Sequence, residues 1–286
     1  MDFLKKEKQD VKTVCIDEVR VRNFWEKIFS FYEREGRDLP WRKTTDMYEV
    51  FVSEVMLQQT QVSRVVEKFV SWLERFPRVE SLSSASLYDV LDEWKGLGFN
   101  SRGKRLWDCA KLVVEKYDGV FPRSVDELLR FPGVGPYTAR SVLVFACNAD
   151  EALVDTNIRR IFISEFGLDE KISDKDLQLF AERILPVGRS RDWHNALMDY
   201  GSLVLTAKSS GISPKNKQSK FKGSRRESRA KLLRYVLQYK ELSEEIAKSI
   251  CEENNYCAKE LLDDLVSEGL LIYEEDEKKY FVGGEK

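Results

Sequence analysis

The stretch that decides the fold is FPGVGPYTAR, residues 131–140. The helical patterns SVDELLR and SVLVFAC lie on either side of it, so the stretch predicts a tight turn between two helices. Glycines in such a turn permit positive φ angles and leave neighbouring N–H groups uncovered, and N–H groups at a helix start bind phosphate without reading sequence. The expected phosphate donors are the backbones of Gly133, Val134, Gly135 and Thr138. The alternative is an ordinary helix–helix connection.

Length and composition narrow the class of protein. The 286 residues are 42% hydrophobic and 34% charged, which suits one large domain or two ordinary ones. No apolar run reaches the 18 residues of a membrane span, and the first residues lack the apolar core of a secretory signal. The five cysteines are scattered and odd in number, as expected for free thiols in a reducing compartment. We therefore expect a cytoplasmic, nucleoid-associated protein without membrane contact.

The charges are distributed unevenly along the chain. The formal net charge is only -2. Residues 204–240 hold eleven Lys or Arg against one acid, whereas residues 241–286 hold fourteen acids against five bases. A basic belt followed by an acidic region can bind phosphate locally while the total stays near neutral. A solvated linker with counter-charges fits the same pattern equally well.

Four segments follow from the pattern of apolar and turn residues. Residues 1–20 form a polar lead-in, and residues 21–208 show helical spacing throughout without convincing strands. Residues 209–223 are a basic linker rich in Gly, Ser and Pro. Residues 224–286 predict three helices and a hairpin, which is a winged-helix pattern. Because this last segment is acidic, we expect it to bind a protein partner or pack against the rest of the chain rather than bind DNA.

Two carboxylates are candidates for chemistry. Asp155 in LVDTNIRRIF begins a helix, where an aspartate is ordinarily an N-cap. Glu54 in SEVMLQQTQV has apolar neighbours, which tend to raise a carboxyl pKa and let it hold a proton near neutral pH. An exposed glutamate on an amphipathic helix is the alternative for Glu54. Breaking a glycosidic bond requires two carboxyl groups in separate roles, by analogy with sugar hydrolases.

Seven ordered motifs carry a resemblance over residues 24–202. They are RDLPWR (37–42), SEVMLQQTQV (53–62), WKGLGFNSRGKRL (94–106), GVFP (119–122), FPGVGPYTA (131–139), VDTNIRR (154–160) and ALMDYG (196–201). The chain resembles the MutY-type adenine DNA glycosylases of the helix-hairpin-helix (HhH-GPD) superfamily. The first two motifs indicate the adenine-removing branch.

The resemblance implies a catalytic set. Glu54 corresponds to the acid that protonates adenine, and Asp155 to the aspartate that stabilises the sugar cation, helped by Asn157. Tyr137 lies where a related class carries a Schiff-base lysine, so base removal without strand cleavage is implied.

The resemblance also implies DNA contacts. Arg37, Trp41 and Arg42 correspond to residues that line the base pocket. The alternative role for Trp41 and Tyr137 is core packing, which they can perform as well. Gln59 corresponds to the wedge that fills the gap left by the flipped base.

Three departures from the family pattern limit these expectations. Residues 198–224 contain no cysteine, so the family's iron–sulfur cluster is expected to be absent. Asn100 stands where an aromatic residue usually lies beside the lesion. Residues 224–286 are too short for the nudix-like domain that recognises 8-oxoguanine. Tyr137 and VDTN (154–157) also fit the thymine and uracil mismatch glycosylases.

We therefore predict an all-α, two-lobed helix-hairpin-helix glycosylase fold with a small winged-helix-like α+β module. The expected activity is a monofunctional, metal-free glycosylase that acts as a monomer on double-stranded DNA and removes adenine opposite 8-oxoguanine or guanine. One alternative is removal of thymine or uracil from T:G or U:G pairs. Another is a non-catalytic DNA-binding regulator, which would need neither Glu54 nor Asp155.

Overall fold

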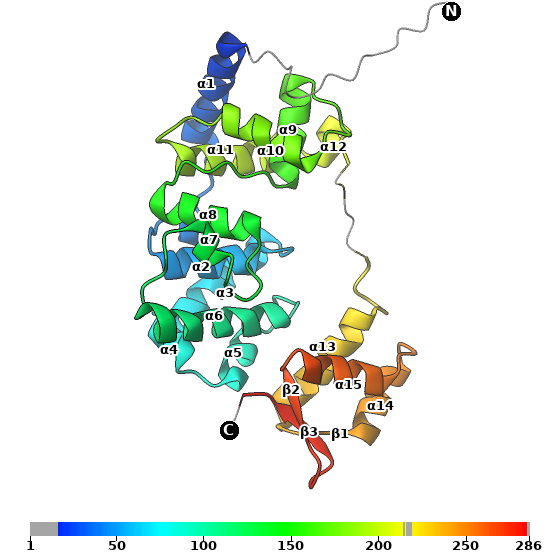
Figure 1. Ribbon diagram of the computed structural model, residues 1–286. Coiled ribbons are helices and arrows are strands. Elements are labelled where there is room, and N and C mark those ends of the chain that lie inside the picture. The colour runs from blue at the N-terminus through cyan, green and yellow to red at the C-terminus, as the bar shows by residue number, and fades with distance from the viewer. Residues whose placement is uncertain (1–16, 214, 216–218, 285–286) are drawn as a thin grey trace, which may run out of the picture. The chain divides into compact units, whose positions relative to one another are not determined.

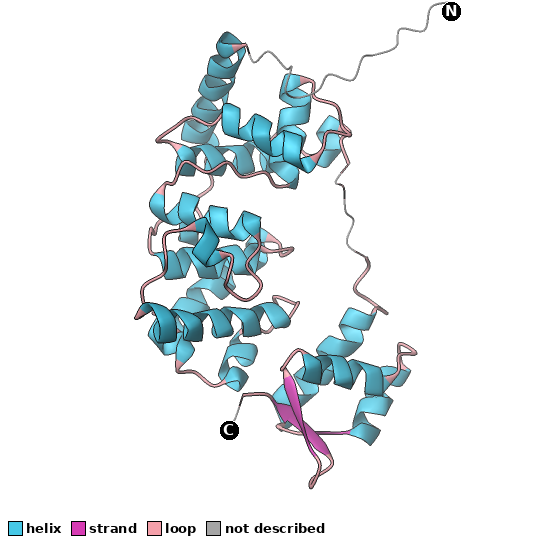
Figure 2. Ribbon diagram, viewed as in Figure 1, coloured by secondary structure: helices cyan, strands magenta, loops and turns pink. Residues whose placement is uncertain are grey.

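The computed structural model describes residues 17–213, 215 and 219–284. The predicted lead-in up to residue 16 and parts of the predicted linker lie outside these residues. Helices dominate the described chain, and its three short strands all lie after residue 240 (Figures 1 and 2). This confirms the predicted helical fold with a small α+β module. The segment boundaries stay a prediction, since the chain divides into two compact units that each combine separate segments.

One unit comprises Met1–Asp38 and Pro136–Lys217. Its helices are α1 (Glu18–Glu35), α8 (Pro136–Cys147), α9 (Thr156–Phe166), α10 (Asp174–Arg183), α11 (Ser190–Leu203) and α12 (Ala207–Ser210). Apolar residues at helical spacing place one face of α1, α9 and α11 in a shared core. Phe24 of α1 meets Trp193 of α11 edge to face, with ring centroids 5.4 Å apart. The packing fixes α9, which begins directly after Asp155.

The other unit comprises Leu39–Gly135 and Gln218–Lys286. Its first segment holds the 3-10 helix η2 (Pro40–Arg42), α2 (Met47–Leu57), α3 (Val62–Arg75), α4 (Val79–Ser83), α5 (Leu87–Glu93), α6 (Ser101–Tyr117) and α7 (Val125–Leu128). Trp72 and Trp94 are fully buried and meet edge to face at 5.6 Å. The phenol of Tyr48 donates a hydrogen bond of 2.8 Å to the carbonyl of Phe76 and so satisfies its buried hydroxyl.

The second segment of that unit is the C-terminal module. It runs α13 (Arg225–Tyr239), β1 (Leu242–Ser243), α14 (Glu244–Glu252), α15 (Ala258–Ser267), β2 (Leu271–Glu274) and β3 (Lys279–Val282). The strands form an antiparallel sheet in the order β1-β3-β2, with Leu271 opposite Val282 and Leu242 opposite Tyr280. This order of helices and strands is that of a winged-helix domain.

The module packs against helix α5 of the same unit. The phenol of Tyr88 on α5 donates a hydrogen bond of 2.7 Å to the carbonyl of Leu237 on α13. The ammonium group of Lys240 lies 3.1 Å from the centroid of the Tyr88 ring. A Cβ on Gly284 would lie 3.1 Å from the Trp107 ring and 3.3 Å from Leu87, so the end of β3 is in close contact with the helices as well.

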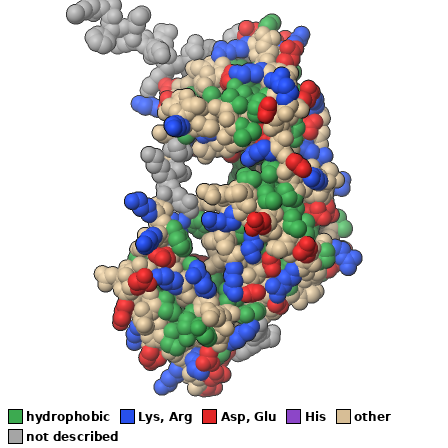
Figure 3. Space-filling view, turned by 180° about the vertical axis from the view of Figure 1, so that it is seen from behind, with side chains coloured by type: hydrophobic (Ala, Val, Ile, Leu, Met, Phe, Trp, Pro, Cys, Tyr) green, Lys and Arg blue, Asp and Glu red, His purple; other side chains and the backbone are tan. Residues whose placement is uncertain are grey.

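Basic and acidic side chains are interspersed on the face of the molecule drawn in Figure 3, with small hydrophobic patches among them. This face therefore carries no continuous basic surface, and a phosphate bound there would depend on a few individual Lys or Arg side chains. Within the described residues, no helix is both long and apolar enough to span a bilayer.

Candidate active site

The predicted turn lies between α7 and α8. Gly133 has φ +74°, a backbone conformation that favours glycine, and a Cβ at this position would also displace the Arg105 side chain, whose Cδ would lie 2.5 Å away. A Cβ on Gly135, in contrast, would meet nothing within 4 Å, so the backbone there borders open space. Val134 is turned inward and its N–H donates to the carbonyl of Phe131 at 3.1 Å. The side chain of Thr138 is buried, while Tyr137 is 36% exposed.

Asp155 is the N-cap of α9. Its Oδ1 accepts a hydrogen bond of 2.7 Å from the N–H of Ile158, which satisfies one of the free donors at the helix start. Its Oδ2 accepts a hydrogen bond of 3.2 Å from the amide of Asn157. Burial raises the pKa of Asp155 above its usual value, against the opposing effect of these hydrogen bonds and of Arg160. Asp155 is thus both the cap and a perturbed carboxyl group.

A hydrogen-bonded chain behind Asp155 fixes its orientation. Arg160 donates to Oδ1 of Asn157 at 2.6 Å and to the carbonyl of Gly201 on α11 at 2.7 Å. A Cβ on Gly201 would lie 2.8 Å from Cβ of Asn157, so only glycine permits this approach of α9 and α11. Gly201 and Arg160 were not singled out from the sequence, although both lie in the quoted motifs ALMDYG and VDTNIRR.

The single histidine of the chain also positions this segment. His194 on α11 is 1% exposed, and its Nε2 accepts a hydrogen bond of 2.9 Å from the N–H of Leu153. Its Nδ1 therefore carries the proton and donates to the carbonyl of Ser190 at 2.7 Å. Burial lowers the pKa of His194 to about 4, so the ring is neutral at physiological pH. His194 binds the backbone two residues before Asp155.

Glu54 lies in the other unit, on helix α2. Phe51, Val52, Val55 and Met56 around it are buried, whereas Glu54 itself is half-buried. The sequence prediction of an apolar environment for this carboxyl group is consistent with these neighbours. Its role as a proton donor stays a prediction.

The three residues predicted to line a base pocket are placed as follows. Arg37 donates to the buried carboxylate of Asp199 through Nε at 2.6 Å and through its backbone N–H at 2.8 Å. Trp41 lies in η2 and its ring meets that of Phe69 edge to face at 5.8 Å. Arg42 ends η2 and is half-exposed. The carboxylate of Asp199 therefore fixes both the backbone and the side chain of Arg37, the first of these three residues.

Gln59 lies at the tip of the loop after α2 and is exposed, with φ +56°. A non-glycine residue in this region is uncommon and costs free energy, so surrounding contacts must maintain it. The buried guanidinium of Arg102 supplies them. Its Nη1 donates to the carbonyls of Val55, Met56 and Gln58 at 2.8, 3.1 and 2.6 Å.

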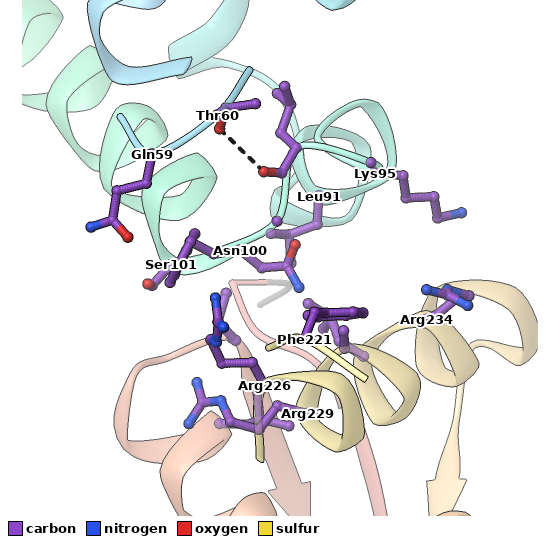
Figure 4. A pocket seen from close by; sticks show the side chains of 18 of the residues that line it. Gln59, Thr60, Leu91, Lys95, Asn100, Ser101, Phe221, Arg226, Arg229 and Arg234 are labelled. Carbon is purple, nitrogen blue, oxygen red and sulfur yellow. Dashed lines mark hydrogen bonds between the residues drawn. The ribbon is translucent and has the colours of Figure 1, made fainter. Parts of the chain in front are cut away.

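A second loop is bound by the same guanidinium. Nη2 of Arg102 donates to the carbonyls of Leu97 and Gly98, both at 3.0 Å, and to the hydroxyl of Thr60 at 3.1 Å. The loop tip, Phe99, also has a positive φ of 48°. A hydrogen bond of 3.4 Å from Thr60 to the carbonyl of Leu97 joins the two loops (Figure 4). Asn100 follows Phe99 as the N-cap residue of α6.

The four cysteines that the structure describes are dispersed and do not fit the four-cysteine iron–sulfur cluster of the family that the sequence resembles. Cys109 lies on α6 and Cys147 on α8, while Cys251 and Cys257 belong to the C-terminal module. In the part of the chain that the structure describes, no three His, Cys, Asp or Glu side chains are arranged to hold a metal ion. Residues 198–224, where the cluster ligands are expected, hold no cysteine in the sequence.

A glycine turn before a helix, followed twenty residues after Gly135 by an aspartate that caps α9 and has a raised pKa, defines a helix-hairpin-helix protein with a candidate catalytic carboxylate. Residues 52–186 match the family model described as HhH-GPD superfamily base excision DNA repair protein. The chain belongs to the HhH-GPD superfamily.

Two relatives named adenine DNA glycosylase illustrate the match. The protein of Mycolicibacterium smegmatis is 41% identical over 193 residues, which cover 66% of each chain. The human protein is 37% identical over 203 residues, which cover 66% of this chain and 37% of the human one. The chain thus spans between about a third and two thirds of the length of these relatives.

Among solved structures, a thermostable thymine-DNA glycosylase is 28% identical, with a TM-score of 0.63, and the match covers 69% of this chain and 91% of that one. An endonuclease III–DNA complex at 18% identity and TM-score 0.60 supports the fold alone.

Proposed function

We propose that this chain is a monofunctional DNA glycosylase that binds duplex DNA and removes adenine mispaired with 8-oxoguanine or guanine. The observation that carries the proposal is Asp155, a carboxyl group with a raised pKa fixed at the start of α9, twenty residues after Gly135. An N-cap that only stabilises a helix needs neither burial nor the hydrogen bonds by which Arg160 holds Asn157 and Asn157 holds the carboxylate. The adenine glycosylases among the relatives support adenine as the base.

The proposed reaction is hydrolysis of the bond between C1′ of deoxyribose and the base nitrogen. Glu54 donates a proton to adenine, and the C1′–N bond breaks with its electron pair leaving on the base. Asp155, ionised and assisted by Asn157, stabilises the positive charge left on the sugar. Water adds to C1′ and loses a proton, which yields an abasic site. The backbone of the turn at Gly133 and Gly135 binds DNA phosphate, while the N–H of Val134 stays bonded to the carbonyl of Phe131. Gln59 occupies the gap of the flipped base.

The proposed chemistry uses side chains of this chain alone. The cysteine positions do not suit a four-cysteine cluster, so no step is assigned to one. Tyr137 offers no amine for a Schiff base, so the proposed enzyme does not cleave the strand. We further propose that it acts as a monomer.

Thymine is the second candidate base, because of one specific observation. The match to the thymine-DNA glycosylase covers 91% of that structure, whereas the adenine-specific relatives extend well beyond the matched region. Removal of thymine from T:G pairs would use the same Asp155, with a different set of contacts to the base.

The test is a panel of labelled duplexes that carry A:8-oxoG, A:G, T:G or U:G, incubated with the full chain and then treated with alkali. Alkali cleaves the strand at abasic sites, so the fragments report base release. We expect fragments from A:8-oxoG and A:G, and none before the alkali step. Release from T:G alone would replace adenine by thymine, and binding without any release would establish a non-catalytic DNA-binding protein.

A further inference from the structure

The C-terminal module and the two loops bound by Arg102 enclose a groove of which the proposed mechanism uses only Gln59. The cavity measures about 760 Å³, within the roughly 300–1000 Å³ range of ligand sites. Gln59, Phe99 and Asn100 border it on the loop side, and Arg226 and Arg234 of α13 border it on the module side. Figure 4 shows Asn100 and Arg226 pointing toward the space between the two sides.

The arginines of α13 fall into two groups. Arg225 and Arg229 form ion pairs with Asp264 at 2.6 and 3.0 Å, and Arg229 also pairs with Glu268 at 2.7 Å. The carboxylates of Asp264 on α15 and of Glu268, the residue that follows its end, are thus paired with arginines of the module itself. Arg229 and Glu268 also border the groove, but as an ion pair whose charges cancel, so this pair contributes little to phosphate binding.

Arg226 and Arg234, the other two arginines of α13, are different. Arg226 directs its guanidinium toward Phe99, 5.3 Å from the ring centroid, and donates to the carbonyl of Ser219 at 2.7 Å. Arg234 lies eight residues further along α13 and is exposed at the same groove. Among residues 17–213, 215 and 219–284, no carboxylate pairs with Arg226, Arg234 or Arg64, all of which border the groove. Of the described residues that border it, the single acid is Glu268, which is already paired with Arg229.

Aromatic and apolar surface accompanies these cations. Phe99 is 37% exposed and Phe221 is 51% exposed at the groove. Leucines of the two sides form its apolar floor, among them Leu91 and Leu233. Cations interleaved with exposed aromatic rings are the pattern of grooves that follow a nucleic acid strand, with phosphates on Arg and bases stacked on the rings.

We propose that this groove binds a DNA strand beside the position that Gln59 enters, with Arg226 and Arg234 on phosphates and Phe221 against a base. The module is then a part of the DNA-binding surface, in place of the protein partner expected from its acidic composition. This inference rests on the proposed function only for the entry of Gln59 into the duplex. The charges and rings on the groove wall stand independently of which base is removed.

The test compares two double variants of the full chain. Arg226→Gln with Arg234→Gln removes the groove cations. Lys248→Gln with Lys259→Gln is the matched control, since both lysines are exposed on the same module and lie outside the groove. The probe is a duplex with an A:8-oxoG pair, bound by each variant in an Asp155→Asn background so that the base stays in place. Thermal unfolding checks that all proteins are folded.

We expect the groove variant to bind roughly 10-fold more weakly at low salt and its plot of log K against log salt to flatten by about 0.9 for each phosphate that is no longer neutralised. The control should retain the parental affinity and slope. Equal affinity and slope in both variants would overturn the groove as a DNA site and return the module to a protein partner. Base release by the chain with native Asp155, measured separately, tests the proposed function, so either proposal can fail while the other stands.

Discussion

Asp155 combines two roles that make opposite demands on the fold. As the N-cap it stabilises α9, whereas burial of its charge raises its pKa and makes the ionised form costly. Asn also caps helices well. We therefore expect Asp155→Asn to lower base release about 100-fold or more while duplex affinity is retained.

The same variant should be at least as stable as the parent at pH 7. A raised folded pKa means that the folded chain holds this proton to higher pH than the unfolded chain, so ionisation favours unfolding. Removal of the charge relieves that cost, and the advantage should shrink at acidic pH, where Asp155 is protonated in both states. Thermal unfolding of both proteins across this pH range measures it. In a separate assay of base release, turnover by Asp155→Asn close to that of the parent would contradict the catalytic role assigned to Asp155.

His194 predicts a second pH dependence, of the opposite sign. Its pKa is lowered to about 4 from 6.5, so the unfolded chain takes up a proton before the folded chain does. The stability that the neutral ring contributes is present above pH 6.5 and is lost as pH falls toward 4, at about 1.4 kcal/mol per pH unit, or about 3 kcal/mol in total. Urea unfolding between pH 7 and 4 should show this loss. His194→Gln should flatten the dependence, and an unchanged slope in that variant would exclude His194 as its source.

At the scale of elements, two loops with unfavourable backbone conformations depend on one buried side chain. Arg102 is 7% exposed and burial lowers its pKa to about 10, so it remains charged at neutral pH. Its acceptors are backbone carbonyls and one hydroxyl rather than a carboxylate. A planar guanidinium can reach all of them at once, which an ammonium group cannot.

We expect Arg102→Lys to lower the free energy of unfolding by about 2–4 kcal/mol, because several buried carbonyls are left without donors. The Gln59 loop should also become mobile. A 2-aminopurine probe at the target position should then show slower base flipping at saturating protein. Arg123→Lys, at an exposed arginine outside both loops, is the control. A drop in stability without any change in flipping would limit Arg102 to a structural role.

The two loops also show where sequence reasoning ends. The glycine turn and the cap at Asp155 are local, so residue type and spacing within a few positions predict them. The acceptors of Arg102 at Val55 and Met56 are backbone groups 46 to 47 residues away, and backbone acceptors leave no trace in residue type. Gly201 is similar, since the residue that excludes a larger side chain, Asn157, comes from another helix.

At the scale of the whole molecule, the winged-helix module could be predicted from its pattern of helices and strands, but its attachment to α5 could not. That attachment places Arg226 and Arg234 on the wall of the groove. Tyr88 is central to it through the hydrogen bond to Leu237 and the contact with Lys240, while Tyr88 itself lies outside the groove. DNA affinity and module docking should therefore be coupled.

A graded pair of substitutions tests this coupling. Tyr88→Phe removes only the hydroxyl and should cost about 1 kcal/mol of docking free energy, whereas Tyr88→Ala also removes the ring under Lys240 and should cost about 2–4 kcal/mol. Amide exchange in α13 and salt-dependent duplex binding should then change in the same order, Ala more than Phe, because a loosened module positions its arginines less well. Faster exchange in α13 with unchanged DNA affinity would separate docking from binding and place the DNA contacts of this chain outside the module.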